Sequence, residues 1–175
     1  MKPQGFTLLE LLITLTVLCL AITLGLPTFT KQISESRVRA ATLTLLDAIE
    51  KTRATAVFRN QHAVLVPVNN KWHEGWTLFV DKNKNGSLDS GEETVNVNQQ
   101  LDAVISQANG AMNSYVAFIG TGESRQIGPN GNGGFLSGTI KICPIVKGEG
   151  YSLVLSKAGR TRVGRLSVAE CAAIH

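Results

Sequence analysis

The sequence predicts an α+β fold in which one long N-terminal helix, its first half embedded in a membrane, packs on antiparallel β-strands. Three observations support this prediction. From Phe6 to Leu26 the chain is apolar and Glu10 is its only charged residue. Apolar residues then recur every three or four positions up to about residue 60, as on one face of a helix. Beyond residue 62 short apolar runs with a period of two alternate with Gly, Asn and Asp.

The first expected element is a hydrophobic transmembrane segment over residues 6–27, since about 20 apolar residues are enough to cross a bilayer. Lys2 is the only charge before it, which places the short leader in the cytoplasm and the rest of the chain outside. Glu10 costs roughly 2.5–3.5 kcal/mol inside such a segment and therefore needs a partner. A secretory signal with Leu8 to Leu20 as its apolar region, or a plain single-pass anchor, are the alternatives.

The residues around Glu10 carry a resemblance to a known class of proteins. Gly5-Phe6-Thr7-Leu8-Leu9-Glu10 resembles the prepilin signature of type IV pilins and type II secretion pseudopilins. The resemblance implies that a prepilin peptidase removes the leader, residues 1–5, by cutting between Gly5 and Phe6, and that the new amine of Phe6 is methylated. It also implies that Glu10 pairs with the amine of a neighbouring subunit during assembly.

The second expected element is the amphipathic half of the same helix, residues 28–60. Val38, Ala41, Leu45 and Ile49 form its apolar stripe, which Leu46, Ala56 and Val57 widen. Proline removes a backbone hydrogen bond and clashes with the preceding turn, so we expect a kink or a weakened stretch at Gly25 to Pro27.

The remaining residues, 61–175, predict one β-rich globular domain with a basic tail. The expected strands are 63–68, 76–80, 94–99, 115–119, 135–142, 151–156 and 161–166, and a division into two small sheets is one arrangement open to them. A Gly/Asn-rich stretch at 120–134 is expected to be a mobile loop. Cys143 and Cys171 lie in the exported part, where thiols become oxidised, and we expect them to form a disulfide rather than two buried thiols. Cys19 is expected to act as a small apolar side chain.

A run of oxygen-bearing side chains follows the second expected strand. Its spacing matches a calcium-binding EF loop at the ligand positions, which would be Asp81, Asn83, Asn85, Ser87, Asp89 and Glu92, with Gly86 at the turn. The flanking segments predict strands, however, whereas helices normally orient such a loop. A solvated Asn/Asp/Gly turn is therefore the favoured interpretation, and calcium binding stays open beside it.

Charge is concentrated at the end of the chain. The segment 141–175 has a net charge of +4, equal to that of the whole protein. It contains only two anions, Glu149 and Glu170, and six cations, which are Lys141, Lys147, Lys157, Arg160, Arg162 and Arg165. Such an excess is typical of a surface that binds a polyanion. On a strand, Arg160 and Arg162 would share one face about 6.6 Å apart, close to the spacing of successive DNA phosphates. The alternative is an edge strand that carries Arg for solubility.

Gly159 is expected to let the backbone turn and approach the ligand, and Arg125 in the Gly-rich loop to extend the patch. Gly159-Arg160-Thr161-Arg162 is similar to the GRxR motif of FimT-type minor pilins, which capture extracellular DNA for natural transformation. No aromatic residue interrupts the segment 157–165, so contacts would be made to the DNA backbone with little sequence preference.

Together these segments resemble the GspH/FimT family of minor pilins and pseudopilins. The resemblance implies a pilin-like fold, other pilins and double-stranded DNA as partners, and no cofactor. It also implies a location first in the inner membrane, with the C-terminal domain in the periplasm, and then in a pilus at the cell surface. A purely structural pseudopilin of type II secretion is the alternative. His62, His73 and His175 are scattered and no nucleophile motif occurs, so we expect no enzyme.

Overall fold

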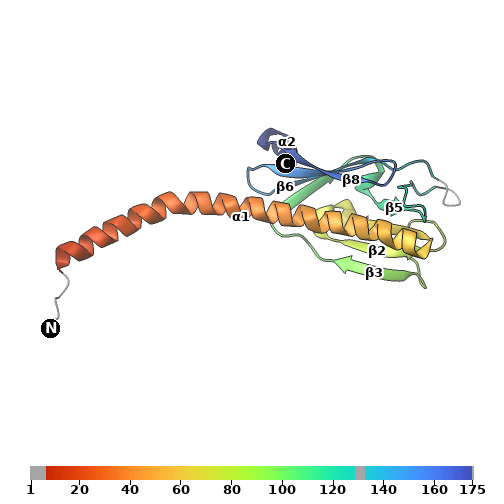
Figure 1. Ribbon diagram of the computed structural model, residues 1–175, viewed down its shortest axis with the longest axis horizontal. Helices are drawn as coiled ribbons and strands as arrows, with labels where there is room; N and C mark the ends of the chain where they lie inside the picture. Colours follow the sequence, from red (N-terminus) through yellow and green to blue (C-terminus); the bar gives the residue numbers. More distant parts are fainter. Residues whose placement is uncertain (1–6, 129–132, 175) are drawn as a thin grey trace.

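The computed structural model describes residues 7–128 and 133–174, and within the first helix it leaves the side chains of residues 24–28 undescribed. The leader, the cleavage site between Gly5 and Phe6, and His175 lie outside the described residues. The chain forms one long helix, two antiparallel sheets and a short C-terminal helix (Figure 1). This architecture confirms the predicted α+β fold, with one long helix packed on antiparallel sheets.

The long helix α1 extends over Leu8–Arg59, 52 residues in all. It begins with a capping box, in which the Thr7 hydroxyl accepts from the Glu10 backbone N–H and the Glu10 carboxylate accepts from the Thr7 N–H. It ends at Asn60, which adopts the left-handed conformation common at helix C-termini. The helix continues through Gly25–Pro27 without a break and curves gently along its length (Figure 1).

The membrane segment expected over residues 6–27 lies partly outside the described residues. Within the described part of the chain, no helical stretch combines the length and the hydropathy that a membrane crossing requires.

The strands form two four-stranded sheets, each antiparallel throughout. The first sheet has the order β3-β2-β1-β5, with β1 at His62–Pro67, β2 at Trp76–Asp81, β3 at Glu93–Asn98 and β5 at Val116–Phe118. The second has the order β4-β6-β7-β8, with β4 at Val104–Ala108, β6 at Gly138–Pro144, β7 at Gly150–Leu155 and β8 at Thr161–Leu166. Short 3₁₀ turns lie at Val68–Asn70, Trp72–Glu74 and Gly110–Asn113.

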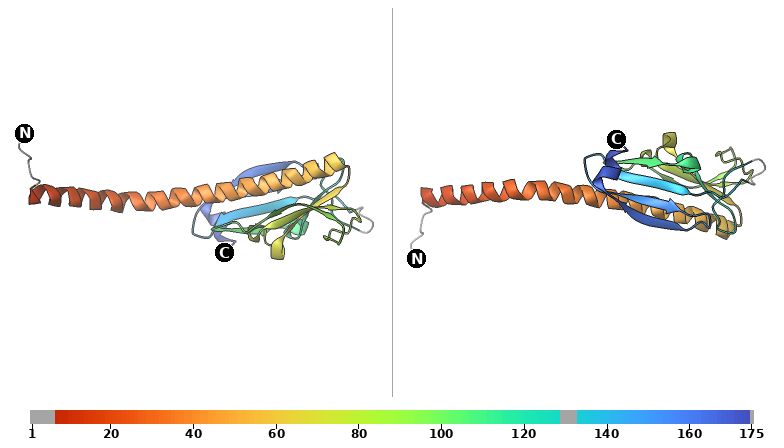
Figure 2. Two further views of the ribbon diagram at one scale, coloured as in Figure 1. Left: turned by 90° about the horizontal axis from the view of Figure 1, so that it is seen from below. Right: turned by 90° about the horizontal axis from the view of Figure 1, so that it is seen from above.

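The core lies between α1 and the two sheets. The helix runs along the junction of the sheets and contributes side chains to both (Figures 1 and 2). The predicted stripe is confirmed, since Val38, Ala41, Leu45 and Ile49 are all at most 6% exposed. Val57 was expected in the same stripe but is 49% exposed. It lies in the last turn of α1, and its side chain is next to the loop at Gly122.

The C-terminal end is held by a covalent bond. Cys143 at the end of β6 forms a disulfide with Cys171 in the short helix α2, Val168–Ala172, as the cysteine positions predict. Both sulfurs are buried against Leu166. Gly150 lies beside them, and a Cβ built there would be 2.5 Å from the Cys171 sulfur. The bond therefore fixes α2 on the side of the second sheet that faces away from α1.

Candidate nucleic-acid interface

The basic motif lies on the turn that joins β7 to β8. The Ser156 N–H donates to the Arg160 carbonyl (2.9 Å), and the Gly159 N–H donates to the Ser156 carbonyl (2.9 Å). The Ser156 hydroxyl accepts from the Arg160 N–H at 3.1 Å. These bonds extend the β7–β8 pairing by one residue beyond the strands, so the alternation of side chains continues to Arg160. Arg160 and Arg162 therefore share one face, and both side chains are exposed.

Gly159 allows the β7–β8 turn to pack closely against the rest of the domain. Its φ is +76°, a conformation that side chains rarely adopt, and a Cβ built there would lie 2.2 Å from the Gly122 carbonyl oxygen and 3.2 Å from the Phe118 ring. The residue is buried. The expectation that its missing side chain lets a ligand approach is therefore wrong, because that space is filled by the protein itself.

Two side chains, those of Arg53 and Ser124, hold the β7–β8 turn against the rest of the domain. The Arg53 guanidinium, near the end of α1, donates to the carbonyl of Gly122 (2.9 Å) and reaches the carbonyl of Ala158 (3.5 Å). The buried Ser124 hydroxyl has three carbonyl oxygens within hydrogen-bond distance, those of Leu136 (2.8 Å), Ser156 (2.9 Å) and Lys157 (3.3 Å), and its single proton donates to one of them at a time. Neither residue is adjacent to the motif in sequence. Together they attach the basic turn to the helix end and to the loop that follows β5.

The strand register divides the six cations of the tail. Arg162 pairs with Val154 and lies on the face of the second sheet away from α1, and Lys141 of β6 shares that face through Ser152. Two strand spacings and an offset of two residues along the strands, about 12 Å in all, separate their backbones. Arg165 pairs with Tyr151 and faces α1, where it lines a small cavity with Arg39 and Leu43.

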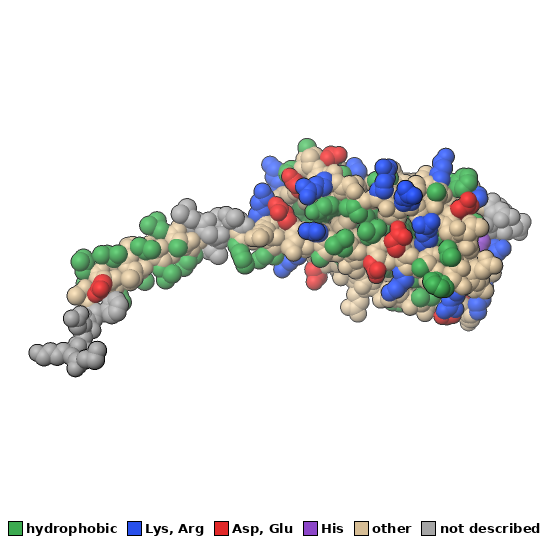
Figure 3. All heavy atoms as spheres, in the orientation of Figure 1, with side chains coloured by type: hydrophobic (Ala, Val, Ile, Leu, Met, Phe, Trp, Pro, Cys, Tyr) green, Lys and Arg blue, Asp and Glu red, His purple; other side chains and the backbone are tan. Residues whose placement is uncertain are grey.

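The remaining two cations lie at opposite ends of the domain. Lys157 lies in the β7–β8 turn, whereas Lys147 lies in the loop after β6 and lines a cavity with Thr30 and Lys31 of α1. Figure 3 shows Lys and Arg side chains distributed over the visible face of the domain, with Asp and Glu among them. The six residues therefore form no single patch, and Arg160, Arg162, Lys157 and Lys141 are the ones that the fold places on neighbouring surfaces.

The ion pairs of the described residues leave the motif exposed to solvent. They join Lys31 to Glu35, Arg59 to Glu93, Lys71 to Glu74 and Arg125 to Glu123. None of these four pairs includes Arg160 or Arg162. Arg125, expected to extend the basic patch, lies over the Phe135 ring at 4.1 Å and pairs with Glu123 at 2.9 Å. That expectation is wrong, since the guanidinium is engaged within its own loop.

The loop between β2 and β3 satisfies its polar groups internally. The buried Asp81 carboxylate accepts from the backbone N–H groups of Asn85 (3.2 Å) and Gly86 (2.8 Å). The amides of Asn83 and Asn85 donate to Asp89 at 2.7 and 2.6 Å, and these bonds lower the pKa of that carboxyl. Glu92 accepts from the Lys82 N–H. Within the described chain no cluster of three or more Asp, Glu, His or Cys side chains is arranged to hold a metal ion.

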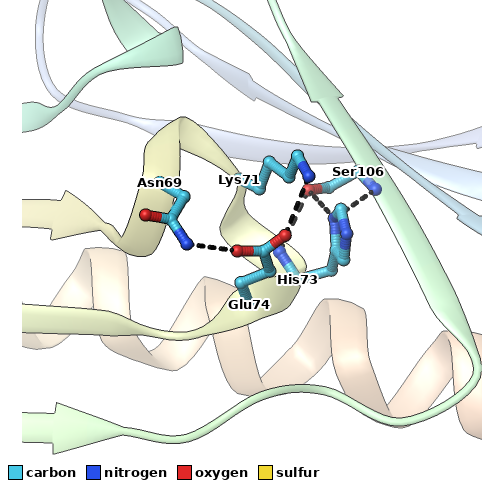
Figure 4. A network of polar contacts seen from close by, with 5 residues as sticks. All are labelled: Asn69, Lys71, His73, Glu74 and Ser106. Atoms are coloured by element: carbon cyan, nitrogen blue, oxygen red, sulfur yellow. Dashed lines mark hydrogen bonds and ion pairs between the residues drawn. The ribbon is translucent and has the colours of Figure 1, made fainter.

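A histidine links the two sheets. The Nδ1 atom of His73 accepts from the Ser106 backbone N–H (3.0 Å), and the Ser106 hydroxyl accepts from the His73 backbone N–H (3.0 Å) (Figure 4). Nδ1 can accept only in a neutral ring, and burial lowers the pKa of His73. The carboxylate of the next residue, Glu74, accepts from the Asn69 side-chain amide (2.8 Å) and from the Lys71 ammonium (2.9 Å), and both bonds lower the pKa of Glu74. This bridge was not expected from the sequence, because Ser106 belongs to a strand that the pattern did not predict.

At the other end of the molecule, Glu10 has a partner within its own chain. Its carboxylate lies 3.3 Å from the Thr7 N–H and 3.4 Å from the Thr7 hydroxyl. The carboxylate that was expected to need a neighbouring subunit therefore also caps α1.

Comparison with known proteins places the chain in a family. Residues 41–159 match the family of the type II transport protein GspH, and residues 1–26 match the prokaryotic N-terminal methylation motif. No curated protein sequence matches the chain. The type IV minor pilin FimU of Pseudomonas aeruginosa shares the fold, with a TM-score of 0.57 and 17% identity over 74% of this chain and 90% of that one.

The minor pseudopilin EpsH of the Vibrio cholerae type 2 secretion system has a TM-score of 0.51 and 12% identity, over 73% of this chain and 96% of that one. At these identities the two solved structures show a shared fold. The family match covers most of the chain, from the buried half of α1 to the β7–β8 turn, and the methylation motif covers its start. The chain therefore belongs to the GspH family.

Proposed function

We propose that this protein is a minor pilin that binds double-stranded DNA without sequence preference, as FimT-type minor pilins do in natural transformation. The observation that carries the proposal is the β7–β8 turn. Arg160 and Arg162 are exposed there on one face, and the turn that presents them is fixed by Arg53, Ser124 and Gly159. Because the backbone of this turn is already held in place, binding does not have to order it, which favours affinity.

The chemistry of the pair suits phosphate. A guanidinium has a planar set of donors that binds two phosphate oxygens at once, and it stays charged at any physiological pH. Lys157 and Lys141 lie on adjoining surfaces and add to the attraction. Lys147 and Arg165, which the sequence grouped with them, face elsewhere and are expected to contribute little.

The N-terminus supports processing and assembly. We infer that prepilin peptidase cuts between Gly5 and Phe6, that Phe6 is then methylated, and that residues 6–27 anchor the chain in the inner membrane with its domain in the periplasm. In the filament, Glu10 exchanges its bond with Thr7 for the amine of a neighbouring pilin. Retraction of the pilus then draws bound DNA inward. These roles involve binding and assembly, without catalysis and without a cofactor.

A second candidate is a structural subunit of a pilus or of a type II secretion system that touches only other pilins. Two observations favour it: the tail cations are dispersed, and the fold is shared by a minor pseudopilin as well as by a minor pilin. It predicts that the purified protein has no measurable affinity for DNA.

A gel-shift assay on the purified full-length chain in detergent separates the two. Arg160→Ala with Arg162→Ala is expected to weaken DNA binding at least about tenfold, since each charged contact contributes on the order of 1 kcal/mol or more. The matched control is Arg37→Ala with Arg39→Ala, which removes two positive charges from exposed positions that are also two residues apart in sequence but lie on α1. Wild-type binding by the first variant, or equal loss in both, would show that the motif is not the DNA site.

A further inference from the structure

The end of the domain nearest the free part of α1 has a surface that DNA binding does not use. The loop of residues 145–149, between β6 and β7, exposes two adjacent apolar side chains, Ile145 (56%) and Val146 (61%). It lies against the turns of α1 just after the apolar run and forms with them an open cavity of roughly 600 Å³, whose lining includes Thr30, Lys31, Ser34, Val146, Lys147 and Glu149. A second hollow on the other side of Val146 includes Ile33, Arg37 and Ile145.

The position of this loop along the helix is informative. The apolar run ends near residue 27, and at 1.5 Å per residue the turns from Thr30 to Arg37 lie roughly 5–15 Å beyond it. The headgroup layer on each side of a bilayer is about 5–8 Å thick. If residues 6–27 span the membrane, the loop at 145–149 therefore lies at the level of the lipid headgroups and just above them.

The composition of the surface suits that level. Ile145, Val146 and the 61%-exposed Phe29 provide apolar groups that the interfacial layer accepts. Lys31, Arg37 and Lys147 provide three cations for lipid phosphates. Two anions, Glu35 and Glu149, also line the cavity, and Glu35 lies 3.8 Å from Lys31 in an exposed pair, so the three cations leave this surface a small net positive charge. Figure 3 shows charged side chains and apolar ones mixed over this end of the domain.

We propose that the β6–β7 loop is a second membrane contact, with Ile145 and Val146 entering the interfacial layer and Lys31 and Lys147 meeting anionic lipid headgroups. This inference rests on the proposed anchoring of residues 6–27. It assigns an orientation to the subunit before assembly. The loop and α1 hold the domain upright, and the β7–β8 turn, which contacts Arg53 some 23 residues further along α1, stands about 35 Å higher and away from the bilayer.

Spin labels at three positions test the proposal in the full chain, inserted at one copy per disc into nanodiscs that contain phosphatidylglycerol. The native Cys19 carries the label that reports the anchor. In a Cys19→Ala background, Val146→Cys carries the label on the loop. Phe58→Cys, which replaces a 92%-exposed apolar residue at the far end of α1, is the control. Collision rates with oxygen and with a water-soluble nickel chelate give the depth of each label.

We expect the label at 146 to lose nickel accessibility and gain oxygen accessibility relative to the label at 58, with the label at Cys19 deepest. Equal water exposure at 146 and 58, with Cys19 still buried in lipid, would overturn the loop contact and leave the anchor intact. Water exposure at Cys19 would overturn the anchor and the loop contact together. Shielding at 146 that appears only when several chains share a disc would identify a second subunit, rather than lipid, as the occupant.

The lipid charge gives a second measurement. In discs of phosphatidylcholine alone, the cations lose their phosphatidylglycerol partners and the label at 146 should become more accessible to nickel. Lys147→Gln in phosphatidylglycerol discs should produce a change in the same direction. Unchanged accessibility in both experiments would contradict the role of the cations at this surface.

Discussion

At the scale of single residues, Gly159 gives the clearest link between sequence and site. Gly159→Ala is expected to destabilise the domain by about 1–3 kcal/mol, because the residue has a positive φ and its Cβ would overlap the Gly122 carbonyl. Gly91→Ala is the matched control, since φ there is +94° but no atom lies within 4 Å of the added Cβ. Thermal melting measures both. An equal loss in the two variants would show that the contact with Gly122 has no role.

His73 makes stability depend on pH. Burial lowers its pKa below the usual value, so the unfolded state binds the proton first as the pH falls below about 6.5. The hydrogen bond from the Ser106 N–H to His73 therefore makes its full contribution to stability above that pH. The contribution is lost as the pH falls from there through the lowered pKa. We expect the melting temperature to drop between pH 7 and pH 5.

His73→Asn keeps an acceptor for the Ser106 N–H but does not titrate, so it should flatten part of this pH dependence. The remainder is expected to come from His62, whose pKa is also lowered, first by burial and then by Lys84. His62→Gln is therefore the companion variant. A double variant that melts with an unchanged pH profile would contradict both assignments.

Variants at Glu10 and Thr7 distinguish the two roles of the Glu10 carboxylate, helix capping and assembly. Glu10→Gln should keep the capping box with Thr7, since glutamine serves at this position, but it removes the charge that an amine of a neighbouring subunit requires. We expect the variant to be cleaved normally and to be missing from sheared pili. Thr7→Ala removes the cap, at a cost of about 0.5–2 kcal/mol to the helix, and keeps the charge, so it should still assemble. Glu10→Gln subunits in normal amounts in the pili would contradict the ion pair.

At the scale of elements, the disulfide and α2 form one unit. Reduction of the Cys143–Cys171 bond should release Val168–Ala172, because a five-residue helix has too few internal hydrogen bonds to persist alone. A loss of about 2–4 kcal/mol is typical for such a cross-link. Melting with and without a reducing agent, together with hydrogen exchange at residues 168–174, measures the effect. An unchanged melting temperature would mean that packing against Leu166 holds the helix without the bond.

The elements also show what the sequence pattern can and cannot predict. The buried face of α1 and six of the strands follow from periodicity, because one face of each element meets a single core. The strand β4 was missed, since Val-Ile-Ser-Gln-Ala has only two strongly apolar β-formers. The segment Phe135–Ile142 was expected to be one strand, but β6 begins at Gly138 and Phe135 makes only an isolated bridge with Arg125. The signal for α2 was present in Ser167 and Glu170, which form a capping box.

The basic motif was visible in sequence, but its support was not. Arg53, Gly122 and Ser124 reach the turn from segments 30 to more than 100 residues away along the chain. The division of the six cations was hidden for the same reason. Which face Arg165 or Lys141 occupies depends on the order and register of the strands, and a single sequence gives neither.

At the scale of the whole molecule, the chain is polarised along α1. Its 52 residues extend over about 78 Å, with the capping box at one end and the proposed DNA site beside the other. The β6–β7 loop, residues 145–149, lies near the middle of α1, where the globular domain begins (Figure 1). This arrangement agrees with the proposed function, in which the N-terminal end of α1 anchors and assembles the subunit and the basic turn faces outward.

The most direct test of the DNA-binding account is the salt dependence of binding to a short duplex, measured by fluorescence anisotropy for the wild type and for Arg160→Ala with Arg162→Ala. Each phosphate contact contributes about 0.9 to the slope of log affinity against log salt concentration. The account predicts a slope that falls by about 2 in the double variant and stays unchanged in Arg37→Ala with Arg39→Ala. Identical slopes in the wild type and the Arg160 and Arg162 variant would contradict it.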